Sequence, residues 1–255
     1  MQIVTLTTDF GTEDFYTAVL KGSLLSAQPD IHIADITHNV KNYNIVQAAY
    51  AIRHTFHAFP PGTIHIASVH NFYAPNPRFL LIKYRNHYFI GPDNGVFSLA
   101  FEREQVECYE IPYQNYDILS FKNAYVHAVG HLCKKLPLEN IGPRCAEITE
   151  RFSLQAITAE TMIRGTVIHI DHFENVILNI TRELWDRYSY FHRFALFFKR
   201  HDPITELSTT YADVPVGDTL CLFNSANHLE IAINLGKAAS MLSLDVEDAV
   251  QLEFY

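Results

Sequence analysis

The sequence predicts an α/β N-terminal domain, with a mostly parallel sheet between helices, followed by a smaller all-β barrel domain. Two observations lead to this prediction. Strand-like and helix-like patterns alternate up to about residue 140, as in successive βαβ units. From Glu160 onward, short strand patterns are separated by turn residues, which is typical of a small barrel or sandwich. We expect domains over residues 1–145 and 160–255, joined by a linker over 146–159.

The first strand is expected over residues 3–8, where a β-branched run ends at Asp9-Phe10-Gly11. A helical pattern follows from about Asp14 to Gly22. In the rest of this domain we expect the strands 31–36, 63–69, 79–84 and 87–90 and the helices 44–57, 96–101 and 125–135. In the second domain we expect strands over 162–171, 176–180, 194–199, 219–224 and 229–233.

Composition restricts the class of protein. The 255 residues are 48% hydrophobic and carry a net charge of −9 without a basic run, which argues against a nucleic-acid partner. No run of about 18 apolar residues occurs, so a membrane span is unsupported, as is a signal peptide. The four cysteines are scattered without a Cys-x-x-Cys pair, which favours reduced thiols in the cytoplasm and no structural zinc.

Polar residues gather at expected strand ends and turns: Asp9 with Asp14, Thr37 with His38, residues 70–78, and Asp93 with Asn94. Ligands of open α/β sheets bind beyond the carboxyl ends of the strands, so these clusters are candidates for a binding site. Taken singly, each also has a structural interpretation. Asp9 and Asp14 could cap a helix, residues 91–95 could be only a tight turn, and residues 171–175 only a hairpin loop.

Several common enzyme classes are disfavoured because their motifs are absent from the sequence. The chain has no Gly-x-Gly-x-x-Gly, no Walker loop and no Gly-x-Ser-x-Gly. The fourteen histidines do not form a zinc helix, since His127 and His131 lie four apart without the adjacent glutamate. We therefore expect no metal and no bound cofactor.

A series of spaced motifs resembles the S-adenosyl-L-methionine (SAM) hydroxide adenosyltransferases, which are relatives of fluorinase and chlorinase. In order, the motifs are Thr8-Asp9-Phe10-Gly11, Asp35-Ile36-Thr37-His38, Gly91-Pro92-Asp93-Asn94-Gly95, Ile170-Asp171, Asn175 with Asn179-Ile180, and Asn224-Ser225 with Gly236. The resemblance covers nearly the whole chain. It implies a homotrimer in which SAM, as substrate, binds between the N-terminal domain of one subunit and the C-terminal domain of its neighbour.

The resemblance also implies roles for individual residues. Asp9 would hold the ribose hydroxyls, because a carboxylate can accept two charge-assisted hydrogen bonds from a vicinal diol. Tyr43 would lie beside the sugar and the sulfonium, where a ring face suits a cation. The remaining substrate contacts would be Asp14, which supports the loop, Phe121 and Asn123 at the nucleophile pocket, Asp171 near the ammonium, Asn175 at adenine, and Ser225 near the carboxylate.

This chain departs from the family pattern where water is activated. The family carries Asp-Pro-Gly-Val-Gly followed by Arg, and later a His-Gly-Arg-Asp-like stretch, and its Asp, Arg and His hold the attacking water. Here Arg78 is retained, His70 or Asn71 replaces the Asp, and Lys122 replaces the His. Glu174 stands where the family usually has glycine.

The reaction implied is displacement at the 5′ carbon of SAM by water, giving adenosine and methionine. Methionine is a good neutral leaving group, so the step depends mainly on positioning and desolvating the nucleophile. His70 could act as the base, and Lys122 could hold an anion. Because the triad is incomplete, a halide nucleophile and a noncatalytic adenosine or SAM binder remain as alternatives.

Overall fold

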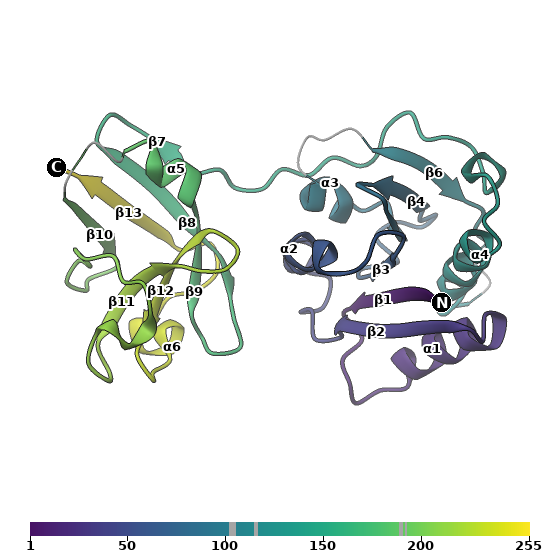
Figure 1. Cartoon of the computed structure of the whole chain (residues 1–255), viewed down its shortest axis with the longest axis horizontal. Coiled ribbons are helices and arrows are strands. Elements are labelled where there is room, and N and C mark those ends of the chain that lie inside the picture. The colour runs from purple at the N-terminus through teal and green to yellow at the C-terminus, as the bar shows by residue number, and fades with distance from the viewer. Residues whose placement is uncertain (102–105, 115–116, 189–190, 192) are drawn as a thin grey trace. The chain divides into compact units, whose positions relative to one another are not determined.

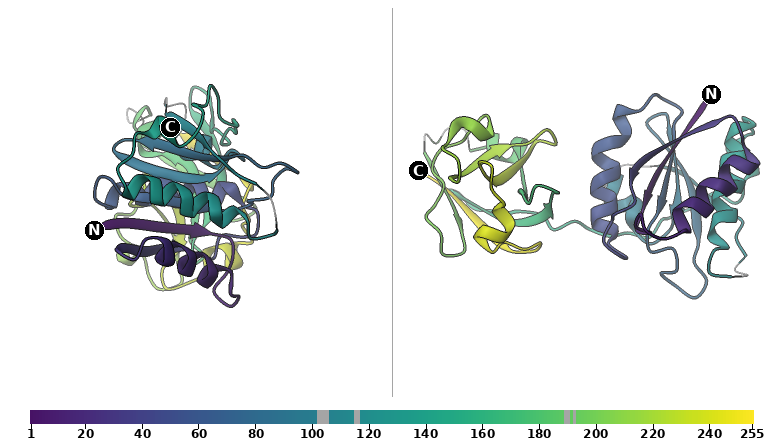
Figure 2. Two further views of the ribbon diagram at one scale, coloured as in Figure 1. Left: turned by 90° about the vertical axis from the view of Figure 1, so that its right-hand side faces the viewer. Right: turned by 90° about the horizontal axis from the view of Figure 1, so that it is seen from below.

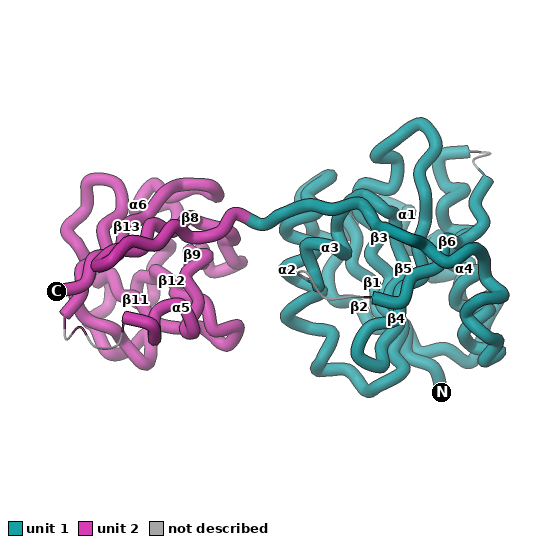
Figure 3. Tube along the Cα trace, turned by 90° about the horizontal axis from the view of Figure 1, so that it is seen from above, with its two compact units in different colours: residues 1–153 teal, residues 154–255 magenta. Residues whose placement is uncertain are grey.

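The computed structural model describes residues 1–101, 106–114, 117–188, 191 and 193–255. The chain forms two compact units, residues 1–153 and 154–255 (Figure 3). Each unit has its own hydrophobic core. Within the described residues, no helix combines the length and apolar character needed to cross a membrane.

The first unit is built on one six-stranded sheet in the order β2-β1-β3-β5-β4-β6. The strands are β1 (Gln2–Thr8), β2 (Ile31–Thr37), β3 (Ile64–Ser68), β4 (Phe79–Tyr84), β5 (His87–Pro92) and β6 (Glu107–Ile111). The pairs β2–β1, β1–β3 and β3–β5 are parallel, whereas β4 pairs antiparallel with both β5 and β6. The sheet is therefore mixed, and its parallel part carries the ends of β1 and β3.

Helices cover both faces of this sheet (Figures 1 and 2). The helices are α1 (Tyr16–Ala27), α2 (Ile45–Thr55), α3 (Val96–Phe101) and α4 (Phe121–Cys133), with the 3-10 turns η1 (Phe56–Ala58) and η2 (Leu138–Asn140). Alternate strand residues point to opposite faces, so Val4 and Leu6 join a core under α1 and α4. Leu80 and Ile82 join a second core under α2 and α3. The predicted sheet between two helical layers is confirmed.

The second unit is a seven-stranded antiparallel sheet in the order β10-β13-β8-β9-β12-β11, with β7 beside β8. Its strands are β7 (Ile157–Thr158), β8 (Met162–Ile170), β9 (Val176–Thr181), β10 (Phe194–Phe198), β11 (Thr219–Phe223), β12 (His228–Ile233) and β13 (Ala249–Phe254). The short elements α5 (Arg182–Asp186), η3 (Tyr211–Asp213) and α6 (Ala238–Leu242) connect them. The sheet curls around one large core and forms a half-barrel, which is less closed than the barrel predicted. A second, smaller buried cluster consists of Leu220, Leu222 and Ala232.

Three strands and several boundaries differ from the sequence prediction. The prediction missed β6, β7 and β13, although Val250, Leu252 and Phe254 in β13 alternate as buried residues. Helix α4 begins at Phe121 and α1 at Tyr16, so one starts earlier and the other later than predicted. In α4, the polar residues Lys122 and Asn123 follow the buried Phe121 directly and weaken the apolar pattern at the start of the helix.

Candidate active site

A pocket of about 680 Å³ lies in the first unit, next to the carboxyl ends of β1 and β3. Those two strands are parallel, so the loops that follow them emerge at the same edge of the sheet. The pocket volume is in the range of small-molecule sites. Its lining residues are Asp9, Phe10, Asp14, Tyr16, Asn42, Tyr43, His70, Asn71, Phe72, Ile118, Leu119 and Phe121.

Asp9 is the most firmly anchored acidic residue of this pocket. Its Oδ2 atom accepts the backbone N–H of Tyr43 at 3.0 Å and that of His70 at 3.1 Å. Both donors have left-handed backbone conformations, with φ of 66° at Tyr43 and 52° at His70. This uncommon conformation turns each N–H toward one carboxylate oxygen. Three separate loops are thereby joined at Asp9, and both hydrogen bonds use Oδ2, which leaves Oδ1 without a partner in the described part of the chain.

Aromatic side chains form much of the pocket wall. The Tyr43 ring meets the His70 ring edge-on, with centroids 5.2 Å apart, and Tyr43 is 66% exposed. Phe121 is buried and contacts Phe10 and Phe72, with centroids 5.8 and 5.9 Å away. The wall therefore offers ring faces and edges to a ligand, and the predicted residues Tyr43 and Phe121 both belong to it.

Lys122 and Asn123 do not line the pocket, although they follow Phe121 directly. All three residues lie in the first turn of α4. Successive residues of an α-helix are about 100° apart around its axis, so only one of the three faces the cavity squarely. Phe121 takes that place, Lys122 is half-buried, and Asn123 is exposed.

Asn71 lies at the pocket floor in a buried polar network. Its Nδ2 donates to Ser68 Oγ at 2.9 Å, and its Oδ1 accepts the Tyr125 hydroxyl at 2.6 Å. Tyr125 is completely buried, and burial raises the pKa of its hydroxyl well above the usual range. The Asn71 amide is therefore fixed by two neutral partners. This arrangement favours a structural floor over a group that accepts protons.

Arg78 lies outside the pocket lining and forms an ion pair with Asp93. Its Nε donates to Asp93 Oδ2 at 2.9 Å, and its Nη2 contacts the same oxygen and the carbonyl of Glu147 at 3.1 Å. Hydrogen bonding to Asp93 raises the pKa of Arg78 above its usual value. The other oxygen of Asp93 accepts the Thr149 N–H at 2.7 Å. The pair therefore fastens residues 147–149 to the sheet.

In the second unit, Asp171 and Asn175 belong to the loop between β8 and β9. Asp171 Oδ1 accepts the Asn175 N–H at 2.8 Å, and Oδ2 accepts Asn175 Nδ2 at 3.1 Å. Glu174 has a φ of 64°, and its carboxylate accepts the Ser240 N–H at 3.1 Å and contacts Lys237 Nζ at 2.9 Å. The loop is thus closed internally and tied to α6 through Glu174.

Ser225 is exposed in the turn between β11 and β12, and a buried carboxylate lies beneath that turn. Glu230 is 3% exposed and accepts Tyr211 Oη at 2.8 Å and Asn224 Nδ2 at 3.1 Å. Burial raises the pKa of Glu230, and the charge of Asp171 adds to this effect. Glu230 therefore connects the neighbourhood of Asp171 to the turn that carries Ser225.

Comparison with known proteins shows which family this chain belongs to. The family model of the SAM hydroxide adenosyltransferase N-terminal domain matches residues 4–142, and the model of the C-terminal domain matches residues 165–251. The chain belongs to the SAM hydroxide adenosyltransferase family. The resemblance inferred from the spaced motifs is thus confirmed.

Relatives in this family match over nearly their full lengths. The chain is 28% identical to the (R)-S-adenosyl-L-methionine hydrolase of Methanocaldococcus jannaschii, covering 99% of this chain and 96% of the relative. It is 28% identical to the protein of the same name from Thermus thermophilus, covering 96% of each. It is 26% identical to the fluorinase of Nocardia brasiliensis, covering 98% of this chain and 96% of that protein.

Solved structures agree with the fold of this family. An uncharacterized conserved protein from Thermotoga maritima superimposes with a TM-score of 0.87 at 27% identity, covering 99% of both chains. A conserved hypothetical protein from Thermus thermophilus gives a TM-score of 0.79 at 26% identity, covering both chains completely.

The residues predicted from the sequence are only partly gathered at this pocket. Of those predicted to handle the attacking water, His70 and Asn71 line the pocket, whereas Arg78 and Lys122 do not. Of the expected substrate contacts, Asp9, Asp14, Tyr43 and Phe121 gather at the pocket, and Asn123 does not. The other three expected contacts belong to the second unit, and these are Asp171, Asn175 and Ser225.

Sequence reasoning missed part of the pocket and two buried anchors. The missed lining residues are Phe10, Tyr16, Asn42, Phe72, Ile118 and Leu119. Aromatic residues in loops beside Asp9 and His70 were the available signal, since an exposed ring in a loop often contacts a ligand. Tyr125 and Glu230 carried no such signal, because an isolated polar residue within an apolar element also fits a surface position.

In the described residues, no group of three or more His, Cys, Asp or Glu side chains could hold a metal ion.

Asp93→Ala is expected to lower the free energy of unfolding by about 1–3 kcal/mol, because Arg78 and the Thr149 N–H both lose their acceptor. Urea denaturation followed by circular dichroism measures this change. Glu110→Gln is the matched control, since its exposed carboxylate lies 3.8 Å from Arg78 and should contribute under about 1 kcal/mol. Equal effects of the two substitutions would contradict this assignment.

Proposed function

We propose that this protein transfers the adenosyl group of SAM to water, giving adenosine and methionine. The observation that carries the proposal is Asp9, a carboxylate held by two backbone N–H groups at a pocket in a chain of this family. Full-length similarity to relatives named (R)-S-adenosyl-L-methionine hydrolase supports the same reaction.

In the proposed reaction, Asp9 binds the ribose hydroxyls through the oxygen that the backbone leaves unoccupied. Tyr43 lies beside the sugar and sulfonium, and Phe121 excludes bulk water from the reacting carbon. A water oxygen attacks the 5′ carbon while the bond from carbon to sulfur breaks, and the electron pair leaves with the sulfur of methionine. His70 receives the proton of the attacking water, because its ring lies in the pocket beside Tyr43.

Incubation of the purified protein with SAM should yield adenosine and methionine in equal amounts, separated by chromatography. His70→Gln should lower kcat by about 10²-fold or more, because glutamine cannot take a proton. KM should change little, since the backbone N–H of residue 70 still reaches Asp9. A protein that binds SAM without forming adenosine would contradict the proposed reaction.

The second candidate is a halide nucleophile, which similarity to fluorinase favours. Adding fluoride, chloride or bromide salts to the same assay distinguishes the two reactions. A 5′-halo-adenosine whose yield rises with the halide concentration would show that the halide, and not water, is the nucleophile. Binding of SAM or adenosine by calorimetry, with no product under any salt condition, would identify the chain as a noncatalytic binder.

We further propose that Asp171, Asn175 and Ser225 contact the methionine and adenine parts of SAM, and that the protein is a homotrimer. Light scattering after size-exclusion chromatography tests the oligomeric state. The cytoplasmic location stays a prediction from the cysteine pattern.

A further inference from the structure

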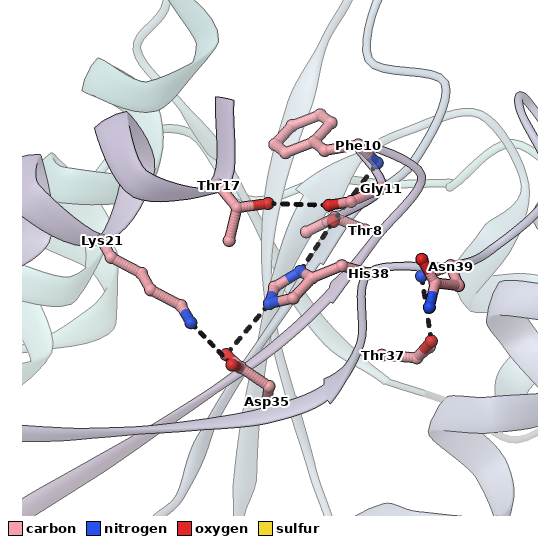
Figure 4. A network of polar contacts seen from close by, with 9 residues as sticks. All are labelled: Thr8, Phe10, Gly11, Thr17, Lys21, Asp35, Thr37, His38 and Asn39. Atoms are coloured by element: carbon pink, nitrogen blue, oxygen red, sulfur yellow. Dashed lines mark hydrogen bonds and ion pairs between the residues drawn. The ribbon is translucent and has the colours of Figure 1, made fainter. Parts of the chain in front are cut away.

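Behind the Asp9 loop, four side chains form a continuous series of polar contacts (Figure 4). Lys21 Nζ lies 2.6 Å from Asp35 Oδ2, and Asp35 Oδ1 lies 3.1 Å from His38 Nε2. His38 Nδ1 lies 2.9 Å from Thr8 Oγ1. Lys21 belongs to α1, Asp35 to β2 and Thr8 to β1, and His38 directly follows β2. The series stops one residue before Asp9.

Thr8 connects this series of side chains to the backbone of the Asp9 loop. Its Oγ1 accepts the N–H of Phe10 at 3.4 Å (Figure 4). This hydrogen bond therefore joins the two residues that flank Asp9 in the sequence. Thr8 is completely buried and His38 is 7% exposed, so water does not compete freely for these groups. The position of Asp9 therefore depends on how Thr8 is held.

One assignment of donors and acceptors is consistent with all contacts of His38 and Thr8. Asp35 lies close to Nε2 of His38, although the two atoms are not aligned as a hydrogen bond, and its negative charge favours a proton on that nitrogen. Nδ1 is then an acceptor, to which the Thr8 hydroxyl donates. The same hydroxyl oxygen keeps its lone pairs for the Phe10 N–H. Lys21 balances the charge of Asp35 at the exposed end.

The backbone of the same segments is joined as well. Gly11 N donates to the His38 carbonyl at 2.8 Å, and Val40 N donates to the Thr8 carbonyl at 3.3 Å. His38 thus contacts the loop both before and after Asp9. A surface ion pair alone would not need this arrangement, since Lys21 and Asp35 could pair without a buried histidine.

We propose that His38, held by Asp35, is a positioning residue that fixes Asp9 through the Thr8 hydroxyl. This inference rests on the proposed function only for its effect on ribose binding. The contacts that orient Asp9 toward Tyr43 and His70 follow from the structure itself.

The test uses three substitutions in neighbouring threonines. Thr8→Val removes the hydroxyl and keeps the shape, and Thr8→Ser keeps the hydroxyl. Thr7→Val is the matched control, because the Thr7 hydroxyl is buried without a hydrogen-bond partner in the described residues. Amide hydrogen exchange by NMR reports on the Tyr43 and His70 N–H groups, which donate to Asp9. Far-ultraviolet circular dichroism verifies that each variant is folded.

In Thr8→Val, the exchange protection of both amides should fall about tenfold, which corresponds to the loss of one hydrogen bond. The affinity for adenosine should weaken by a similar factor, while that for 2′,3′-dideoxyadenosine should stay unchanged. Thr8→Ser and Thr7→Val should resemble the wild type in both measurements. His38→Asn, which keeps a hydrogen-bonding atom near Nδ1, should lose less protection than His38→Leu and provides a second route if Thr8→Val does not fold.

Unchanged protection of both amides in Thr8→Val and His38→Leu would overturn the inference. A uniform loss of protection across the whole first unit would also overturn it, since that result indicates general destabilisation. The proposed function fails separately, if the wild-type protein binds neither adenosine nor SAM. Hydrogen exchange still decides the role of His38 in that case.

Discussion

Asp9→Asn should abolish the ability of the protein to distinguish adenosine from 2′,3′-dideoxyadenosine. Both oxygens of the wild-type carboxylate act as acceptors: Oδ2 accepts hydrogen bonds from two backbone N–H groups, and Oδ1 is free to accept hydrogen bonds from the ribose hydroxyls. An amide has only one oxygen. If that oxygen serves the backbone, an NH₂ group faces the ribose; if it faces the ribose, the Tyr43 and His70 N–H groups lose their acceptor.

The expected loss in kcat/KM for SAM is about 10²- to 10⁴-fold, since hydrogen bonds to a charged group contribute roughly 1.5–3 kcal/mol each. Steady-state kinetics and calorimetry with both nucleosides measure the effect. The dideoxy compound is the control ligand, because it lacks the groups that Asp9 binds and its affinity should change much less. If Asp9→Asn weakened both nucleosides equally, Asp9 would act on the fold of the pocket and not on the ribose.

The position of the binding site could be predicted from the sequence because it depends on strand order. Asp9 and His70 each follow a β-branched or apolar run, and parallel strands bring their carboxyl ends to one edge. The direction in which a side chain points was harder to predict. Arg78 lies in the segment expected to handle water. Its guanidinium instead donates hydrogen bonds to Asp93 and to the carbonyl of Glu147, outside the pocket. Asp93 is fifteen residues away and has no local sequence signal.

In the second unit, too, a contact with a residue distant in the sequence could not be predicted. The hairpin loop with Asp171 and Asn175 was identified from turn residues and from the family motif. Glu174 could be recognised only as a departure from glycine. The structure explains how it is accommodated, since Ser240 and Lys237 hold its carboxylate while its backbone adopts the left-handed conformation. Such compensation depends on α6, more than sixty residues later in the chain.

Acid should destabilise the first unit between pH 6.5 and about 3 through His65. This histidine lies on β3 and is 1% exposed. Its Nδ1 is 2.7 Å from Thr5 Oγ1, and its Nε2 is 3.2 Å from His87 Nδ1. Burial, together with the charge of His87, lowers the pKa of His65 from 6.5 to about 3. The folded protein therefore keeps the ring neutral where the unfolded chain binds a proton.

The sign of the effect follows from this difference in proton binding. Well above pH 6.5 neither state is protonated at His65, and the full stability is present. As the pH falls below 6.5, the unfolded state gains a proton and the free energy of unfolding decreases. The loss continues to about pH 3, where the folded state is also protonated. The difference between 6.5 and about 3 corresponds to roughly 5 kcal/mol, and about half of this is already lost at pH 4.5.

Urea denaturation at several pH values from 8 to 4.5 measures this dependence. His65→Asn should be less stable than the wild type at pH 8, because the smaller side chain leaves a cavity among Phe56, Phe59 and Phe89. Its stability should nevertheless fall less steeply with acid, so that the two curves converge near pH 4.5. His32→Asn on β2 is the control, since an exposed histidine meets solvent in both states. Parallel curves for the wild type and His65→Asn would assign the acid sensitivity to other groups.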